Sequence, residues 1–176
     1  VWDHQDYAKW SLAHIEQDSA YLVMNNGKKD GSVIFEPVPD FIDAMQKSKR
    51  PFAASWGQFG HSWSPGSTKN ASWGKVTLTN DESLPAFSNA SNNNDPRKDP
   101  KGQVNGKLEW SSSGHNFDKS SKADDVVDTE KEWAVNIRAL GGSATVDVTP
   151  RKVSNFKIEK GKTYKWVNMD FSDAKN

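Results

Sequence analysis

The chain contains no cysteine among its 176 residues. A disulfide framework, a cysteine nucleophile, a zinc–thiolate site and an iron–sulfur cluster are therefore excluded. It also lacks an excess charge of either sign, with 23 basic and 23 acidic residues. Nucleic acids and anionic membranes attract basic proteins, so neither is expected as a partner.

Long hydrophobic runs are missing too. No apolar segment approaches the ~20 residues that cross a bilayer, so no membrane partner is expected. No signal peptide is recognisable, and the chain opens at Val1 without methionine. We therefore expect a processed or truncated product of a secreted or periplasmic bacterial protein.

In the first third of the chain, the pattern of apolar residues predicts one N-terminal helix and two buried strands. Residues 4–18 contain no glycine or proline, and Tyr7 and Trp10 fall at helical spacing. Residues 20–24 and 52–56 are short continuous apolar runs, which are typical of strands buried on both faces.

A second helix is expected between these strands, because Asp40 is a good N-cap and Pro51 would end the helix. The strand–helix–strand order predicts a parallel pair, and the loops after parallel strands share one edge of the sheet. Asp30 stands in the first of these loops and His61 in the second. We therefore expect their side chains to lie close together.

Beyond about residue 62 the apolar spacing changes to two, and turn residues separate the alternating segments. Such a pattern is typical of an antiparallel β-sandwich of the immunoglobulin-like type. The predicted fold class is α+β, with a helix and parallel-strand unit over residues 1–65 and a sandwich module over residues 66–176. The expected strands of the module are residues 75–79, 106–110, 133–139, 144–148, 154–158 and 163–167.

Two parallel strands with so few helices cannot bury both of their faces. We therefore expect the first third of the chain to pack against the sandwich, against a second copy in a homo-oligomer, or against a missing N-terminal chain.

The motifs NNGKKDG and FAASWGQFGHS, with a helix ending in Lys-Arg-Pro between them, resemble the last third of α/β-hydrolases. The resemblance covers residues 1–65 and is strongest to the prolyl-oligopeptidase-like and esterase-like branch. It implies that Asp30 is the acid and His61 the histidine of a Ser–Asp–His triad. The segment ATVDVTPRKVSNFKIEKGKTYKW resembles accessory modules that follow such hydrolase domains in bacterial proteins.

The serine of that family lies in a G-x-S-x-G elbow, and the sequence has none. Ser62 and Ser64 adjoin His61, but no strand-to-helix turn precedes them. We therefore predict part of a serine esterase or peptidase whose nucleophile lies outside this chain. The expected substrate is an ester or is related to a polysaccharide. The alternative is an inherited framework that no longer catalyses.

A second hypothesis is a non-catalytic, carbohydrate-binding β-sandwich. The chain has eight tryptophans, and the indole face suits sugar rings as well as protein cores. Trp63, Trp73 and Trp110 flank polar loops, so we expect them to be exposed and to bind carbohydrate. Trp133 and Trp166 alternate with polar residues and are expected in the core.

A third hypothesis is a glycoside hydrolase, which needs two carboxyl groups about 5–10 Å apart. Glu109 beside Trp110 and Glu132 beside Trp133 are the pairs to compare with that geometry. Ordinary patterning of a sheet, in which acids alternate with aromatic residues, explains both pairs equally well.

Other polar groups have simpler explanations than a metal site. Asp3 and Asp6 beside His4 suit the start of a helix, and His115 lies in a polar loop. Residues 92–99 are rich in oxygen donors but lack the regular spacing of a calcium loop. We therefore predict no metal and no cofactor.

Overall fold

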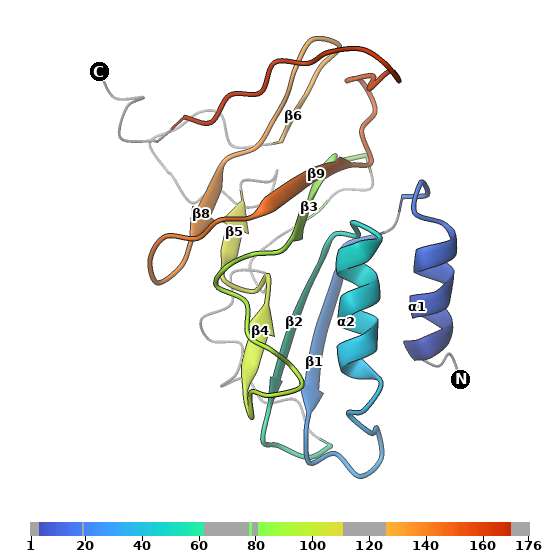
Figure 1. Cartoon of the computed structure of the whole chain (residues 1–176), viewed down its shortest axis with the longest axis vertical. Coiled ribbons are helices and arrows are strands. Elements are labelled where there is room, and N and C mark those ends of the chain that lie inside the picture. Colours follow the sequence, from blue (N-terminus) through green and yellow to red (C-terminus); the bar gives the residue numbers. More distant parts are fainter. Residues whose placement is uncertain (1–3, 19, 62–77, 79–80, 111–125, 170–176) are drawn as a thin grey trace.

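The computed structural model describes residues 4–18, 20–61, 78, 81–110 and 126–169 (Figure 1). Within these ranges the chain is a mixed α+β protein with two helices, one three-stranded sheet and three two-stranded sheets. The predicted α+β class is therefore confirmed. Neither described helix is long and apolar enough to cross a membrane.

The N-terminal region consists of α1 (His4–Ala13), β1 (Leu22–Gly27), α2 (Val38–Lys47) and β2 (Phe52–Gly57). The two strands run parallel, in register from Leu22 opposite Phe52 to Gly27 opposite Gly57. This confirms the predicted order and the parallel pair.

Helix α1 ends at Ala13, five residues before the predicted end at residue 18. Arg50 accounts for the difference, since its guanidinium donates to the carbonyls of His14 and Gln17, at 2.5 Å each. The guanidinium also lies 4.8 Å from the ring centroid of Trp10. Arg151 donates to the Ile15 carbonyl at 2.9 Å, so two arginines satisfy the carbonyls after the helix.

Helix α2 begins three residues earlier than predicted, because Pro37 and not Asp40 is its N-cap. Pro39 occupies the first turn, where a missing N–H costs nothing. Asp40 instead lies within that turn and accepts a hydrogen bond from Arg97 at 2.7 Å. The helix buries Phe41, Ile42 and Met45 against the sheet.

Strand β4 (Gly102–Val104) pairs antiparallel with the free edge of β2. All six residues of β2 are therefore buried, with α2 over one face and polypeptide on both edges. This pairing places a strand from the later part of the chain against the first third. Support from a sandwich stays a prediction. The homo-oligomer and the domain boundary at residue 65 stay predictions.

The other strands form antiparallel pairs. They are β3 (Leu84–Ser88) with β9 (Asp147–Arg151), β5 (Leu108–Trp110) with β8 (Ile137–Ala139), and β6 (Val127–Asp128) with β7 (Trp133–Ala134). The predicted strand over residues 133–139 is thus divided in two. The predicted strands over residues 154–158 and 163–167 are not strands. Of the predicted strand over residues 75–79, all but Leu78 lies outside the described residues. The immunoglobulin-like sandwich stays a prediction.

Two hydrophobic clusters form the interior. The first joins α2 to the three-stranded sheet, and the second surrounds Trp110. Asn105 connects them, because its Nδ2 donates to the carbonyl of Phe52 at 3.2 Å and to that of Phe87 at 3.1 Å. Phe52 belongs to the first cluster and Phe87 to the second.

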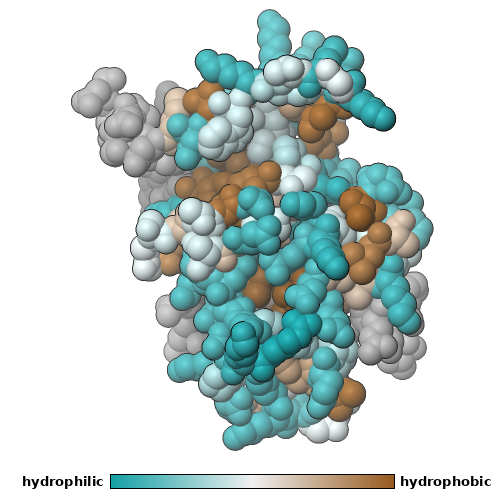
Figure 2. Space-filling model, viewed as in Figure 1, coloured by the Kyte–Doolittle hydropathy of each residue, from teal (hydrophilic) through white to brown (hydrophobic). Residues whose placement is uncertain are grey.

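The surface is mostly polar. Figure 2 shows hydrophilic residues over most of one face, with smaller hydrophobic patches between them. The most exposed large apolar side chains include Ile34, Ile158, Trp166 and Met169. Single exposed apolar residues are normal on soluble proteins.

Candidate functional site

The loops after β1 and β2 run together at one end of the sheet, at the bottom of Figure 1. The Lys28 N–H donates to the Gly57 carbonyl at 2.8 Å, and the Lys29 N–H donates to the Phe59 carbonyl at 3.1 Å. A Cβ at Gly27 would lie 2.2 Å from the Phe59 oxygen. Glycine is therefore required for the close approach of the two loops.

This approach brings Asp30 and His61 together. His61 Nδ1 lies 3.0 Å from Asp30 Oδ2 and 3.2 Å from Oδ1. The predicted juxtaposition is confirmed. The Asp30 side chain is 11% exposed, whereas the His61 side chain is 68% exposed. The acid is thus sheltered beneath an imidazole that is open to solvent.

Backbone groups fix the carboxylate from the other side. Asp30 Oδ1 accepts hydrogen bonds from the N–H of Ser32 at 2.8 Å and of Val33 at 3.0 Å. The bond from Val33 is the main reason that the pKa of Asp30 lies below its ordinary value, and Ser32 and His61 lower it further. Asp30 is therefore ionised at neutral pH.

The charge state of Asp30 determines the state of the histidine. An ionised carboxylate only accepts hydrogen bonds, so Nδ1 of His61 carries the hydrogen in this contact. In a neutral imidazole the other nitrogen, Nε2, is then the basic one. The pair therefore presents an exposed base whose tautomer is set by a sheltered acid.

Lys28, in the loop after β1, connects this edge of the sheet to the loop over residues 95–100. Its Nζ donates to the carbonyls of Pro96 at 2.8 Å and Asp99 at 2.7 Å, and lies 4.9 Å from the Phe35 ring centroid. Trp56 Nε1 donates to the same Asp99 carbonyl at 3.0 Å. Sequence reasoning missed this lysine, because its partners are carbonyl groups some 70 residues away.

The oxygen-rich segment over residues 92–99 is held by its own hydrogen bonds. Asp99 Oδ2 accepts from the Asp95 N–H at 2.8 Å, and Asp95 Oδ1 accepts from the Arg97 N–H at 2.9 Å. In the part of the chain that the structure describes, no three His, Asp or Glu side chains gather as a metal site.

The predicted exposure of Trp110 is wrong. Its side chain is 0% exposed, because all three residues of β5 are buried and its ring packs edge-on against Tyr21 and Phe87. No face of the indole is open to a sugar in this conformation. Trp63 and Trp73 lie outside the described residues, as do Ser62, Ser64, His115 and Asp3.

The predicted core position of Trp166 is wrong as well. It is 82% exposed, because its segment pairs with no described strand. Trp133 is half-buried, and its Nε1 donates to Ser83 Oγ at 2.8 Å.

The two acids of the glycosidase hypothesis differ in environment. Glu109 is 7% exposed at its side chain and forms an ion pair with Arg138, which faces it across the β5–β8 pair. Glu132 is exposed. The Glu109 carboxylate is therefore committed to a cross-strand partner, as expected for a structural ion pair.

Comparisons of the chain with protein-family models, curated proteins and solved structures found no match. The resemblance to α/β-hydrolases therefore rests on the two motifs and on the Asp30–His61 contact. Function is inferred from the chemistry of the site itself.

Proposed function

We propose that this chain supplies the acid and the base of a serine-hydrolase site. The chain would be part of an α/β-hydrolase-like esterase or peptidase that carries an accessory β-sandwich. The Asp30–His61 contact, 3.0 Å long and built on neighbouring parallel strands, is the observation that carries the proposal. The proposed substrate is an ester, including one carried by a polysaccharide.

The chemistry follows from the two nitrogens of the imidazole. Asp30 accepts a hydrogen bond from the Nδ1–H and stabilises the positive charge that forms when Nε2 takes a proton. Nε2 would take this proton from a serine hydroxyl or a water molecule, and then return it to the leaving group. The 68% exposure of His61 leaves room for both reactants.

The ion pair itself contributes little to stability, because its histidine is exposed and solvent screens the two charges. Nevertheless, two backbone N–H groups and a glycine-dependent contact between loops fix Asp30 and His61. Such fixing of an exposed base favours a role in catalysis.

The test is hydrolysis of p-nitrophenyl acetate, an activated ester that a histidine–aspartate pair can cleave slowly through water. We expect the rate above buffer to fall ~100-fold in His61→Ala, and clearly in Asp30→Asn. The matched control is His14→Ala, because His14 is a histidine that follows α1 and is bonded to the Trp10 carbonyl, with no contact to Asp30. Its rate should equal that of the unchanged chain.

Two results would contradict the proposal. One is a rate that survives in His61→Ala, and the other is an equal loss in His14→Ala. Circular dichroism of each variant separates a loss of chemistry from a loss of folding.

A further inference from the structure

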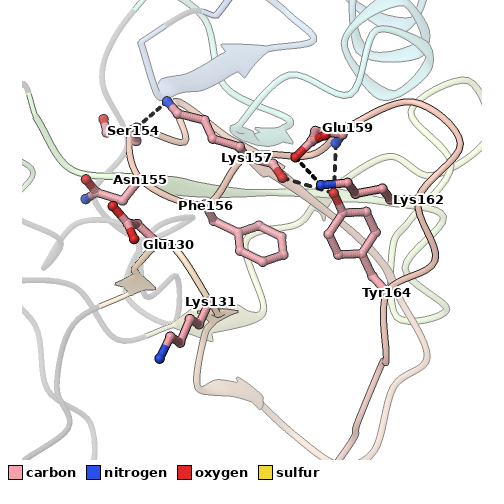
Figure 3. A pocket seen from close by; sticks show the side chains of 9 residues that line it. All are labelled: Glu130, Lys131, Ser154, Asn155, Phe156, Lys157, Glu159, Lys162 and Tyr164. Carbon is pink, nitrogen blue, oxygen red and sulfur yellow. Dashed lines mark hydrogen bonds and ion pairs between the residues drawn. The ribbon is translucent and has the colours of Figure 1, made fainter.

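A second hollow lies at the end of the molecule opposite to the Asp30–His61 pair. It has a volume of about 460 Å³ and opens between the β6–β7 turn and residues 154–164 (Figure 3). This volume falls within the ~300–1,000 Å³ that is usual for small-ligand sites. Glu130 and Lys131 line one side, and Phe156 and Tyr164 line the other.

Two aromatic rings give the hollow an apolar wall. The centroids of Phe156 and Tyr164 lie 5.5 Å apart, and their planes meet at 65°. The Tyr164 hydroxyl accepts from the Glu159 N–H at 2.8 Å and donates to the Lys157 carbonyl at 3.0 Å. The tyrosine ring is thus held in place while 41% of the residue remains exposed.

The loop that carries Phe156 is fixed before any ligand arrives. The Asp128 carboxylate accepts from the N–H groups of Ser154 at 2.6 Å, Asn155 at 3.2 Å and Phe156 at 2.7 Å. Asn155 Nδ2 donates to the Asp128 carbonyl at 2.9 Å. A fixed loop loses little conformational entropy on binding.

Two of the charged side chains in the lining already have partners. Lys157 Nζ donates to the Ser154 carbonyl at 2.6 Å, and Lys162 Nζ pairs with Glu159 at 2.5 Å. Neither Glu130 nor Lys131 has a side-chain hydrogen bond or ion pair with the described part of the chain. The hollow therefore offers one acceptor, Glu130, and one donor, Lys131, beside the ammonium group of Lys157, which is bonded to a neutral carbonyl.

We propose that this hollow binds a neutral sugar unit of an oligosaccharide. The apolar face of a pyranose would stack on the aromatic wall, while its hydroxyls would donate to Glu130 and accept from Lys131. A carboxylate on the sugar would be repelled by Glu130 but attracted by Lys131 and Lys157, so an anionic oligosaccharide is the comparison that tests the neutral assignment. The inference is independent of the dyad, because it uses none of the same residues.

Isothermal titration calorimetry of the full chain with neutral hexasaccharides tests the proposal. The probes are cellohexaose, xylohexaose, mannohexaose and maltohexaose, with hexagalacturonate as the anionic comparison. We expect saturable binding of at least one neutral probe and weaker binding of hexagalacturonate. Phe156→Ala should weaken the binding of the neutral probe at least fivefold, and Glu130→Ala at least threefold.

Trp166→Ala is the matched control, since Trp166 is an aromatic residue of the same segment that is 82% exposed and lies outside the lining. Its affinity should be unchanged. The proposal is overturned if no neutral probe binds, if only hexagalacturonate binds, or if Trp166→Ala abolishes binding while Phe156→Ala does not. Circular dichroism must show that Phe156→Ala is folded, and Glu130→Ala provides the second, surface variant.

Discussion

At the scale of single residues, Asp30 links local backbone geometry to the chemistry of the site. Its carboxylate accepts from two N–H groups of its own loop and from His61 of the neighbouring loop. All three contacts favour the ionised form, which is why the pKa of Asp30 is lowered. One side chain thereby sets the turn after β1 and the tautomer of the histidine.

The lowered pKa gives Asp30 a defined effect on stability. Since its folded pKa lies below its unfolded value of about 4, ionised Asp30 stabilises the fold above pH 4. This contribution is lost as the pH falls through the lower, folded pKa. Asp30→Asn should therefore be less stable than the unchanged chain at pH 6, and the difference should shrink towards pH 2.5. Urea unfolding at both pH values measures it, and a difference that stays constant with pH would contradict the argument.

The residues of the dyad could be predicted from the sequence, and their supports could not. Asp30 and His61 each follow a short apolar strand, so local pattern and strand topology were sufficient. The partners of Lys28 and Arg50 are backbone carbonyls distant in the sequence. Every residue type has such a carbonyl, so the sequence does not indicate which ones accept these hydrogen bonds. The burial of Trp110 depends on β8 and on Tyr21. Both are distant in the sequence, and the residues beside Trp110 do not indicate them.

At the scale of secondary-structure elements, β1, β2 and β5 fall largely within predicted strands and β9 overlaps one, whereas β3 and β4 were not predicted. β1 and β2 are adjacent strands separated by one helix. β3 pairs with β9, which is about 60 residues away and contains Pro150. Residues 163–167 have the alternation of a strand, but they pair with no described strand. Alternation alone therefore does not make a strand.

The contact between the β1 loop and the loop over residues 95–100 depends on a single ammonium group. Lys28→Met should remove the ammonium donor from the carbonyls of Pro96 and Asp99, and the Asp99 carbonyl would keep its bond from Trp56. We expect a loss of about 1–3 kcal/mol in the free energy of unfolding. Urea denaturation at pH 7 measures it.

Lys29→Met is the control for this change, because it removes an adjacent and exposed lysine. It should shift the free energy of unfolding by less than about 0.5 kcal/mol. Equal losses in the two variants would show that charge, and not the contact with the loop, is responsible.

At the scale of the whole molecule, one buried amide connects the two hydrophobic clusters. β4 pairs with β2 of the first cluster, and Asn105 directly after it donates to strands from both clusters. We therefore expect the described regions to unfold as one cooperative unit. Far-ultraviolet circular dichroism and tryptophan fluorescence should give coincident urea transitions.

Asn105→Ala tests this coupling directly. It leaves the carbonyls of Phe52 and Phe87 without the amide donor, and it places alanine at a φ of 61°. We expect a loss of at least about 2 kcal/mol and transitions that separate between the two probes.

Asn89→Ala is the matched control, because Asn89 has a similar φ of 54° but is exposed. A smaller loss with coincident transitions is expected there. Separate transitions in the unchanged chain would instead mean that the two clusters are independent domains.

The approach of the loops at Gly27 also has a consequence for sequence variation. A library of random substitutions, selected for soluble expression, should accept almost nothing but glycine at this position, since a Cβ would meet the Phe59 carbonyl at 2.2 Å. Gly31 lies four residues further on, where a Cβ would meet nothing within 4 Å, and it should vary freely. During evolution, fewer substitutions should therefore be tolerated at Gly27 than at Asp30, the acid whose loop Gly27 positions.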